Sequence, residues 1–416
     1  MPVWDMTALR INGGIQLNEN RADVPAISPW FYRLCRVLGR IAGRLLFSLE
    51  TKRDSALDDI EGGLLILANH QSYADPLLMA TAFPDRMIHF VAGRYLFEKK
   101  WTKRIFRRLG VIAKEQMRPD ARTIRDLLVL ARRGESLFLF PEGQRSVDGR
   151  TNVLHASTAR LVKKLGLPVA VVRMRGAYLS WPRWSKGGVR RGKISQEASL
   201  LFTAQDVACL SPEDLVHRLE QALFVDEYAD QLARAVPRLY SGRKRAERLD
   251  AILHWCPVCR GPFLLKAEDE HLTCCACELT MHVEATGLLT SCQENNSHLS
   301  PSPAAWHEEQ VRAWHQHVLE HGFHFGALIG AADQAETRVT VSVKPEGFFI
   351  RHENGMAALV SHDGVPALFA EYGDFFRLFH DAKPLIVRPD NGQAVVACLD
   401  LIKAGYLRNN TAVMVN

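Results

Sequence analysis

The feature that most constrains this chain is the alternation of short apolar runs with helix-length amphipathic segments between residues 29 and 245. Four runs are rich in β-formers and flanked by polar residues: LLILA (64–68), MIHFVA (87–92), SLFLF (136–140) and LPVAVVRM (167–174). Between them lie segments such as DARTIRDLLVLARRG (120–134), which has one apolar helical face and ends at a glycine. This alternation predicts an α/β layer fold with a mostly parallel sheet and flanking helices.

Length and composition set the number of domains to expect. The chain has 416 residues, 47% hydrophobic and 24% charged, which is typical of a globular protein too large for one core. No apolar stretch approaches the roughly 20 residues that cross a bilayer, and the N-terminus lacks a secretory pattern, which predicts a cytoplasmic protein. We expect five segments in order: a lead-in (1–28), the α/β domain (29–245), a cysteine-rich domain (250–285), a linker (286–303) and a small α+β module (304–416).

Polar loops follow two of the predicted strands. NHQSYADP (69–76) follows LLILA, and FPEGQRS (140–146) begins where SLFLF ends. Ligand sites in open α/β sheets lie outside the carboxyl ends of the strands, so the two loops are expected to converge on one cleft. Taken alone, the first motif is equally compatible with a loop in which Asn69 and Asp75 cap backbone groups.

The residue types in these loops point to acid–base chemistry on an anionic substrate. His70 is a candidate general base at cytoplasmic pH, and Asp75 would fix its tautomer and stabilise the imidazolium. No GxSxG elbow is present and no cysteine lies near these loops, so the base is expected to activate a hydroxyl of the substrate. Arg145 is suited to bidentate binding of an anionic group, phosphate being favoured.

Together these motifs resemble the glycerolipid acyltransferase family, which includes the 1-acylglycerol-3-phosphate acyltransferases. The family pattern is NHxSxxDP, a basic block, FPEGTRS and a proline-started apolar strand, and the chain supplies all four in order within about residues 29–225. The resemblance implies acyl transfer from acyl-CoA or acyl carrier protein to a lysophospholipid hydroxyl, and most simply from 1-acylglycerol-3-phosphate to phosphatidic acid. It implies no organic cofactor beyond the thioester substrate.

The resemblance also assigns residues. It makes His70 the base and Asp75 its partner, and it places Glu142, Gly143 and Arg145 in the acceptor-phosphate loop. We further expect Asn69 and Ser72 to lie against the substrate.

Two departures from the family pattern concern the acceptor. Gln144 replaces a threonine, and Gln116 stands where an arginine is expected. Arg94 is a candidate replacement for that arginine, as are Lys114 and Arg118. The alternatives are therefore a different lysolipid acceptor, a hydrolase that releases acyl groups to water, or a non-catalytic lipid-binding scaffold.

Residues 28–50 have the pattern of a helix that binds the surface of a membrane. Arginines 33, 36, 40 and 44 recur on one helical face, and Trp30, Leu34, Val37, Leu38, Ile41 and Leu45 fill the other. This pattern predicts a helix lying in the membrane interface among anionic lipids, on the inner face of the cell membrane; RYLFEKKWTKRIFRR (94–108) is a second candidate. The alternative is an ordinary surface helix whose apolar face packs on the domain.

The cysteine cluster predicts a structural zinc ribbon. In CPVCRGPFLLKAEDEHLTCCAC (256–277), two C-x2-C pairs flank a predicted hairpin, which gives Cys256, Cys259, Cys274 and Cys277 as ligands. Cys275 and His271 are alternatives for the fourth position. The cluster carries more acidic than basic residues, so no nucleic-acid partner is expected.

The C-terminal stretch predicts a helix over 304–322, then short strands, then a helix over 393–406. The strands followed by a helix loosely resemble a pleckstrin-homology-like module. A dimerisation or packing domain is the alternative.

Overall fold

The protein divides into two compact units, each described here by itself. The α/β unit holds the described residues up to Arg183 together with Gly188–Gly242, and the C-terminal unit holds Trp184–Gly187 and the described residues from Arg243 onward. The computed structural model describes residues 24–115, 120–154, 157–296, 298–330, 335–361, 368–380 and 383–407. Most of the predicted lead-in lies outside these residues.

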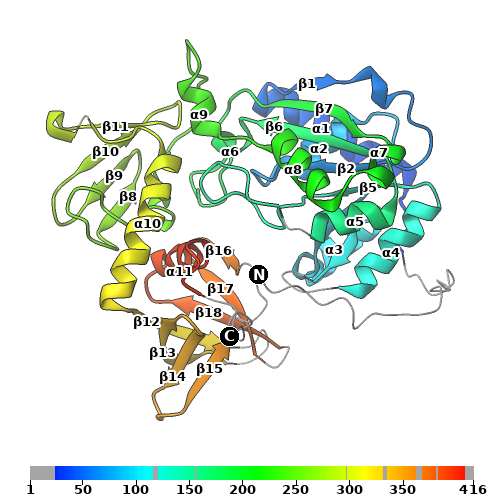
Figure 1. Cartoon of the computed structure of the whole chain (residues 1–416). Helices are drawn as coiled ribbons and strands as arrows, with labels where there is room; N and C mark the ends of the chain where they lie inside the picture. The colour runs from blue at the N-terminus through cyan, green and yellow to red at the C-terminus, as the bar shows by residue number, and fades with distance from the viewer. Residues whose placement is uncertain are drawn as a thin grey trace. The chain divides into compact units, whose positions relative to one another are not determined.

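The α/β unit is built on one seven-stranded sheet in the order β1-β7-β6-β2-β5-β3-β4 (Figure 1). All neighbouring strands are parallel except β6 and β7. The mostly parallel sheet and the four predicted strands are therefore confirmed. Three strands were not predicted: β1, β4 and β7. The strands are β1 (Glu50–Arg53), β2 (Leu65–Ala68), β3 (Ile88–Gly93), β4 (Ile112–Lys114), β5 (Ser136–Leu139), β6 (Val169–Arg175) and β7 (Ser195–Phe202).

Helices cover both faces of this sheet, so the central strand β2 is buried on each side (Figure 1). Ile66 and Ala68 face a core shared with α1 and α2, and Leu65 and Leu67 face a core shared with α4, α5, α7 and α8. A continuous apolar run is what a strand buried on both faces requires. The helices are α1 (Pro29–Phe47), α2 (Asp75–Met79), α3 (Lys100–Arg108), α4 (Ala121–Arg132), α5 (Ser157–Leu165), α6 (Ala177–Ser180), α7 (Ala204–Cys209), α8 (Pro212–Leu223) and α9 (Glu227–Leu232).

Helix α1 packs on the domain through a face of small residues rather than through its apolar stripe. Its buried residues are Tyr32, Gly39, Gly43 and Phe47. A Cβ on Gly39 would lie 3.0 Å from the backbone oxygen of Leu77 in α2, and one on Gly43 would lie 2.8 Å from the Leu49 side chain. Only glycine therefore allows the helix to approach this closely.

The apolar stripe of α1 faces solvent. All six of its predicted residues are between 45% and 73% exposed, so the alternative in which this stripe packs on the domain does not describe the structure. Arg36 differs from the predicted solvent-facing arginines, because its guanidinium donates to the backbone oxygens of Phe83 and Arg86. Within the described part of the chain, no helix has the length and apolarity to cross a bilayer.

The C-terminal unit contains two antiparallel sheets, and two long helices form where they were predicted. The first sheet has the order β11-β10-β9-β8 and surrounds the cysteines. Its strand β11 lies in the expected linker, where it pairs with β10 and adds a fourth strand to the sheet. The strands of the first sheet are β8 (Leu265–Glu268), β9 (His271–Cys274), β10 (Thr280–Val283) and β11 (Leu289–Ser291), and the helices are α10 (Pro303–His321) and α11 (Gln393–Lys403).

The second sheet has the order β15-β14-β13-β12-β18-β17-β16. It contains the strands predicted after residue 338, while the likeness to a pleckstrin-homology module stays a prediction. Its strands are β12 (Phe323–Gly330), β13 (Thr337–Lys344), β14 (Gly347–His352), β15 (Ala357–Ser361), β16 (Phe369–Glu371), β17 (Phe375–His380) and β18 (Lys383–Pro389).

Candidate active site

His70 lies just beyond the carboxyl end of β2 and is held by Asp75. Its Nδ1 is 2.9 Å from Asp75 Oδ2, and the same oxygen accepts the backbone N–H groups of Gln71 at 2.6 Å and Ser72 at 2.8 Å. Asp75 is the first residue of α2 and is fully buried. One carboxylate oxygen therefore fixes both the imidazole and the turn that carries it, and the pairing leaves Nε2 as the nitrogen that can accept a proton.

Asn69 fixes the start of this loop. Its Nδ2 donates to the backbone oxygen of Met174 at 2.9 Å, and the backbone N–H of Met174 donates to its Oδ1 at 2.7 Å. The parallel pairing of β2 with β6 ends at Ala68 and Val172, so the amide continues the connection between the strands. Ser72 is also fully buried, and its Oγ accepts the Ala74 N–H. These contacts position the loop, and a contact of Asn69 or Ser72 with substrate stays a prediction.

Glu142 joins the second loop to the first. Its two carboxyl oxygens accept the backbone N–H groups of His70, at 2.6 Å, and Asn152, at 2.7 Å. The backbone N–H of Ser146 in turn donates to the His70 carbonyl at 2.9 Å. Burial raises the pKa of Glu142 to about 8. The two predicted loops thus meet, and Glu142 lies between them as a buried connector.

Arg145 belongs to the same loop and is half-buried. Its guanidinium carbon is 3.8 Å from the centroid of the Tyr73 ring, a stacked geometry that arginine favours. The Tyr73 ring also lies 5.4 Å from the Trp181 ring, centroid to centroid. Gly143 is exposed and has a φ of 74°, a left-handed conformation that favours glycine in this turn. The arrangement places a guanidinium beside the histidine loop.

The surroundings of His70 keep its imidazole neutral. Its ring stacks on Phe140 with centroids 3.7 Å apart, and its side chain is 15% exposed. Burial lowers the pKa of His70 to about 4; Asp75 opposes the shift, and the positive charges of Arg145 and Arg183 add to it. A neutral imidazole at physiological pH is the form that can act as a base.

Arg183 is a site residue that the motifs did not include, whereas Phe140, which stacks on the imidazole, is the first residue of FPEGQRS. Arg183 is only 5% exposed, yet its charge reaches the imidazole. It lies in an irregular stretch after α6, where no periodicity or motif identifies it.

Arg94, a candidate for the missing acceptor arginine, is engaged elsewhere. It forms an ion pair with Glu115, and its Nη2 lies 3.9 Å from Asp120. It follows β3, two strands away from β2 in the sheet. Lys114 ends β4 at the same edge, whereas Gln116 and Arg118 lie outside the described residues. A contact of Arg94 with the acceptor stays a prediction.

The four predicted cysteine ligands meet in the C-terminal unit. The sulfur atoms of Cys256, Cys259, Cys274 and Cys277 all lie within 4.8 Å of one another. Two of these separations are 3.6 and 3.7 Å, close to the about 3.8 Å that four Zn–S bonds of 2.3 Å at tetrahedral angles require. This donor set fits a metal ion, and among the described residues neither alternative ligand belongs to the group.

Comparisons with known proteins agree with this site. Residues 48–175, which contain both loops, match the family model described as Acyltransferase. This stretch is therefore an acyltransferase domain.

Curated relatives carry a more specific name. A chloroplastic 1-acyl-sn-glycerol-3-phosphate acyltransferase of Brassica napus is 25% identical over 130 residues, which are 31% of this chain and 37% of that protein. A Bacillus subtilis protein named 1-acyl-sn-glycerol-3-phosphate acyltransferase is 23% identical over 88 residues, or 21% of this chain and 44% of that protein. The matches thus span less than half the length of these relatives.

Solved structures were also matched, among them that of one acyltransferase. The crystal structure of the 1-acyl-sn-glycerophosphate acyltransferase PlsC from Thermotoga maritima is 22% identical, with a TM-score of 0.41, over 50% of this chain and 82% of that one.

Proposed function

We propose that the α/β unit transfers an acyl group from a thioester, acyl-CoA or acyl carrier protein, to the hydroxyl of a lysophospholipid. The acceptor we favour is 1-acylglycerol-3-phosphate, which gives phosphatidic acid. The observation that carries the proposal is the 2.9 Å bond between His70 Nδ1 and Asp75, beside the guanidinium of Arg145. The family match and the names of the relatives support the reaction class.

The proposed reaction needs no nucleophile from the protein. His70 Nε2 takes the proton of the acceptor hydroxyl as its oxygen attacks the thioester carbonyl, and Asp75 stabilises the imidazolium that forms. The tetrahedral intermediate then breaks its C–S bond, and the leaving thiolate takes the proton back from His70. Every atom is accounted for, and the imidazole is regenerated neutral.

Arg145 would hold the acceptor in place. A guanidinium can bind phosphate through two parallel N–H bonds, and stacking on Tyr73 restricts its orientation. In this proposal Glu142 and Asn69 act by fixing the two loops relative to each other, which keeps the base within reach of the bound hydroxyl.

The test is acyl transfer by the purified protein to a panel of lysolipids, with acyl-CoA and acyl carrier protein as donors, read by mass spectrometry. We expect phosphatidic acid from 1-acylglycerol-3-phosphate, and its loss in His70→Ala. His217→Ala is the matched control, because His217 is an exposed histidine on α8. Turnover of His70→Ala within a few fold of the parent would remove this residue from the mechanism.

The products also separate the alternatives. A different diacyl lipid would revise the acceptor, free fatty acid would indicate a hydrolase, and no product with retained lipid binding would indicate a scaffold.

We also propose that α1 attaches the protein to the inner face of the cell membrane through anionic lipids. Its exposed apolar residues would enter the acyl boundary, and Arg33, Arg40 and Arg44, all exposed, would face the headgroups. Helix α3 continues this surface, since the Ser28 N–H donates to the Arg108 carbonyl and Trp101 is 64% exposed.

For the C-terminal unit we propose a structural zinc ion at the four cysteines. Four thiolates close the coordination shell and leave no position for substrate, so the ion would stabilise the small sheet β8–β11 and take no part in acyl transfer.

A further inference from the structure

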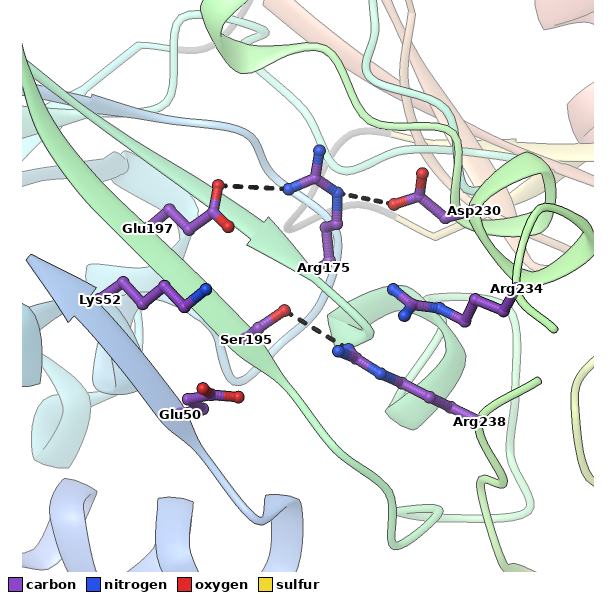
Figure 2. A pocket seen from close by; sticks show the side chains of 8 residues that line it. All are labelled: Glu50, Lys52, Arg175, Ser195, Glu197, Asp230, Arg234 and Arg238. Carbon is purple, nitrogen blue, oxygen red and sulfur yellow. Dashed lines mark hydrogen bonds and ion pairs between the residues drawn. The ribbon is translucent and has the colours of Figure 1, made fainter. Parts of the chain in front are cut away.

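A second hollow of about 180 Å³ lies in the α/β unit at the β1–β7–β6 edge of the sheet (Figure 2). None of its lining residues belongs to the His70 site described above. The side chains come from β1, β6, β7 and the segment at and after α9. They are Glu50, Lys52, Arg175, Ser195, Glu197, Asp230, Arg234 and Arg238.

The acidic side chains of this hollow are already neutralised. Arg175 bridges Glu197, at 3.4 Å, and Asp230, at 2.6 Å, as Figure 2 shows. Glu197 also accepts from Arg173 at 2.8 Å, and Glu50 pairs with Lys193 at 2.5 Å. Arg173 and Lys193 do not line the hollow, so they satisfy its carboxylates from outside.

Positive charge is therefore left over inside the hollow. In Figure 2 Lys52 enters from β1, and Arg234 and Arg238 enter from the opposite side. Arg238 reaches the neutral Ser195 Oγ at 3.4 Å, and the carboxylate on which its charge acts, Glu50, is already paired with Lys193. Four basic side chains line the hollow against three acidic ones, and Arg173 and Lys193 pair two of the acidic ones from outside. Converging cations of this kind attract anions.

The size of the hollow limits the ligand. A volume of about 180 Å³ corresponds to about six water molecules at ~30 Å³ each. That is enough for a phosphate group and a short polar substituent. Arginine forks bind phosphate oxygens in pairs, and several converging cations suit a phosphate, which carries up to two negative charges, better than a carboxylate, which carries one.

Apolar side chains flank the two arginines. In QLARAVPRLY (231–240), Leu232 is 51% exposed, Val236 81% and Leu239 61%, whereas Arg234 and Arg238 turn inward. Exposed apolar residues beside an anion-binding group are what contact with a lipid surface requires.

We infer that this hollow binds the phosphate group of a phosphate ester, carried either by a lipid headgroup or by a soluble molecule. The inference concerns a site separate from acyl transfer and does not depend on it.

The test compares R234Q/R238Q with R132Q/R133Q, a matched pair of exposed arginines at the end of α4. In the soluble arm, inorganic phosphate is titrated by calorimetry in an R145Q background, so that phosphate at the His70 site does not contribute. In the lipid arm, binding to phosphatidylcholine vesicles with and without phosphatidylglycerol is measured. We expect the first pair to weaken anion-dependent binding roughly tenfold or more, and the control pair to match the parent.

The arms distinguish the source of the phosphate. Loss in the phosphate titration supports a site for soluble esters, and loss confined to anionic vesicles supports a headgroup site. R234K/R238K keeps the charge but not the fork, so it should bind more weakly than the parent and more tightly than R234Q/R238Q, which separates lost charge from lost folding. Equal binding by the two glutamine pairs in both arms would overturn the inference.

Discussion

Replacing Asn69 with alanine tests whether the site depends on the bridge between β2 and β6. The side-chain amide makes two hydrogen bonds to the backbone of Met174, at 2.9 and 2.7 Å, and is fully buried. Alanine would leave a buried N–H and a buried C=O of Met174 without partners. Each such group costs about 1–3 kcal/mol, so the two together should cost the α/β unit roughly 2–6 kcal/mol of stability.

Hydrogen exchange of peptides from β2 and β6, read by mass spectrometry, reports this unit alone. A loss of roughly 2–6 kcal/mol corresponds to global exchange faster by about 30-fold to about 20,000-fold. Ser72→Ala is the matched comparison, because it removes one acceptor of one backbone N–H and should cost about 1 kcal/mol. If Asn69→Ala exchanges no faster than Ser72→Ala, the amide does not hold the two strands together.

Three further changes test the charge, lipid and metal proposals. Arg183→Gln removes a positive charge that lowers the pKa of His70, so the acidic limb of the pH profile of kcat/KM should move to higher pH. Arg183→Lys keeps the charge and should leave that limb in place. An acidic limb that does not move in Arg183→Gln would contradict the argument. Leu45→Asp, at a position 73% exposed, should weaken flotation with anionic liposomes at least tenfold without changing the unfolding temperature; unchanged flotation would exclude this face. Cys259→Ser should reduce bound zinc, measured by elemental analysis, and speed hydrogen exchange in β8–β11, whereas Cys275→Ser should do neither.

The sheet was predictable where strands are apolar and not where they are polar. β2 and β5 can be recognised in the sequence, because a strand that is buried on both faces needs continuous apolar residues. β1, ETKR, is mostly exposed at the edge of the sheet and carries no such signal. β7 runs antiparallel to β6, and its direction depends on a long connection that no local pattern encodes.

The site was predictable to the extent that it is made of contiguous motifs. The loop with His70 and Asp75 and the loop with Glu142 and Arg145 were each recognisable, and topology brings them together. Arg183 could not be recognised, because it lies in an irregular segment and its charge acts on His70 from a distant position in the sequence. The two backbone N–H groups that donate to Glu142, those of His70 and Asn152, could not be predicted either. The sequence shows that a carboxylate is present but not which hydrogen bonds it accepts.

The glycine contact of α1 has a consequence for how the enzyme would sit on a bilayer. Gly39 rests on Leu77, two residues after the carboxylate that holds the imidazole. If α1 lies in the membrane interface as proposed, this contact would link the depth of the helix in the bilayer to the height of His70 above the leaflet. The acceptor hydroxyl would then have to reach His70 from the leaflet surface. The length of the lysolipid headgroup, in addition to its chemistry, would therefore influence which acceptor is used.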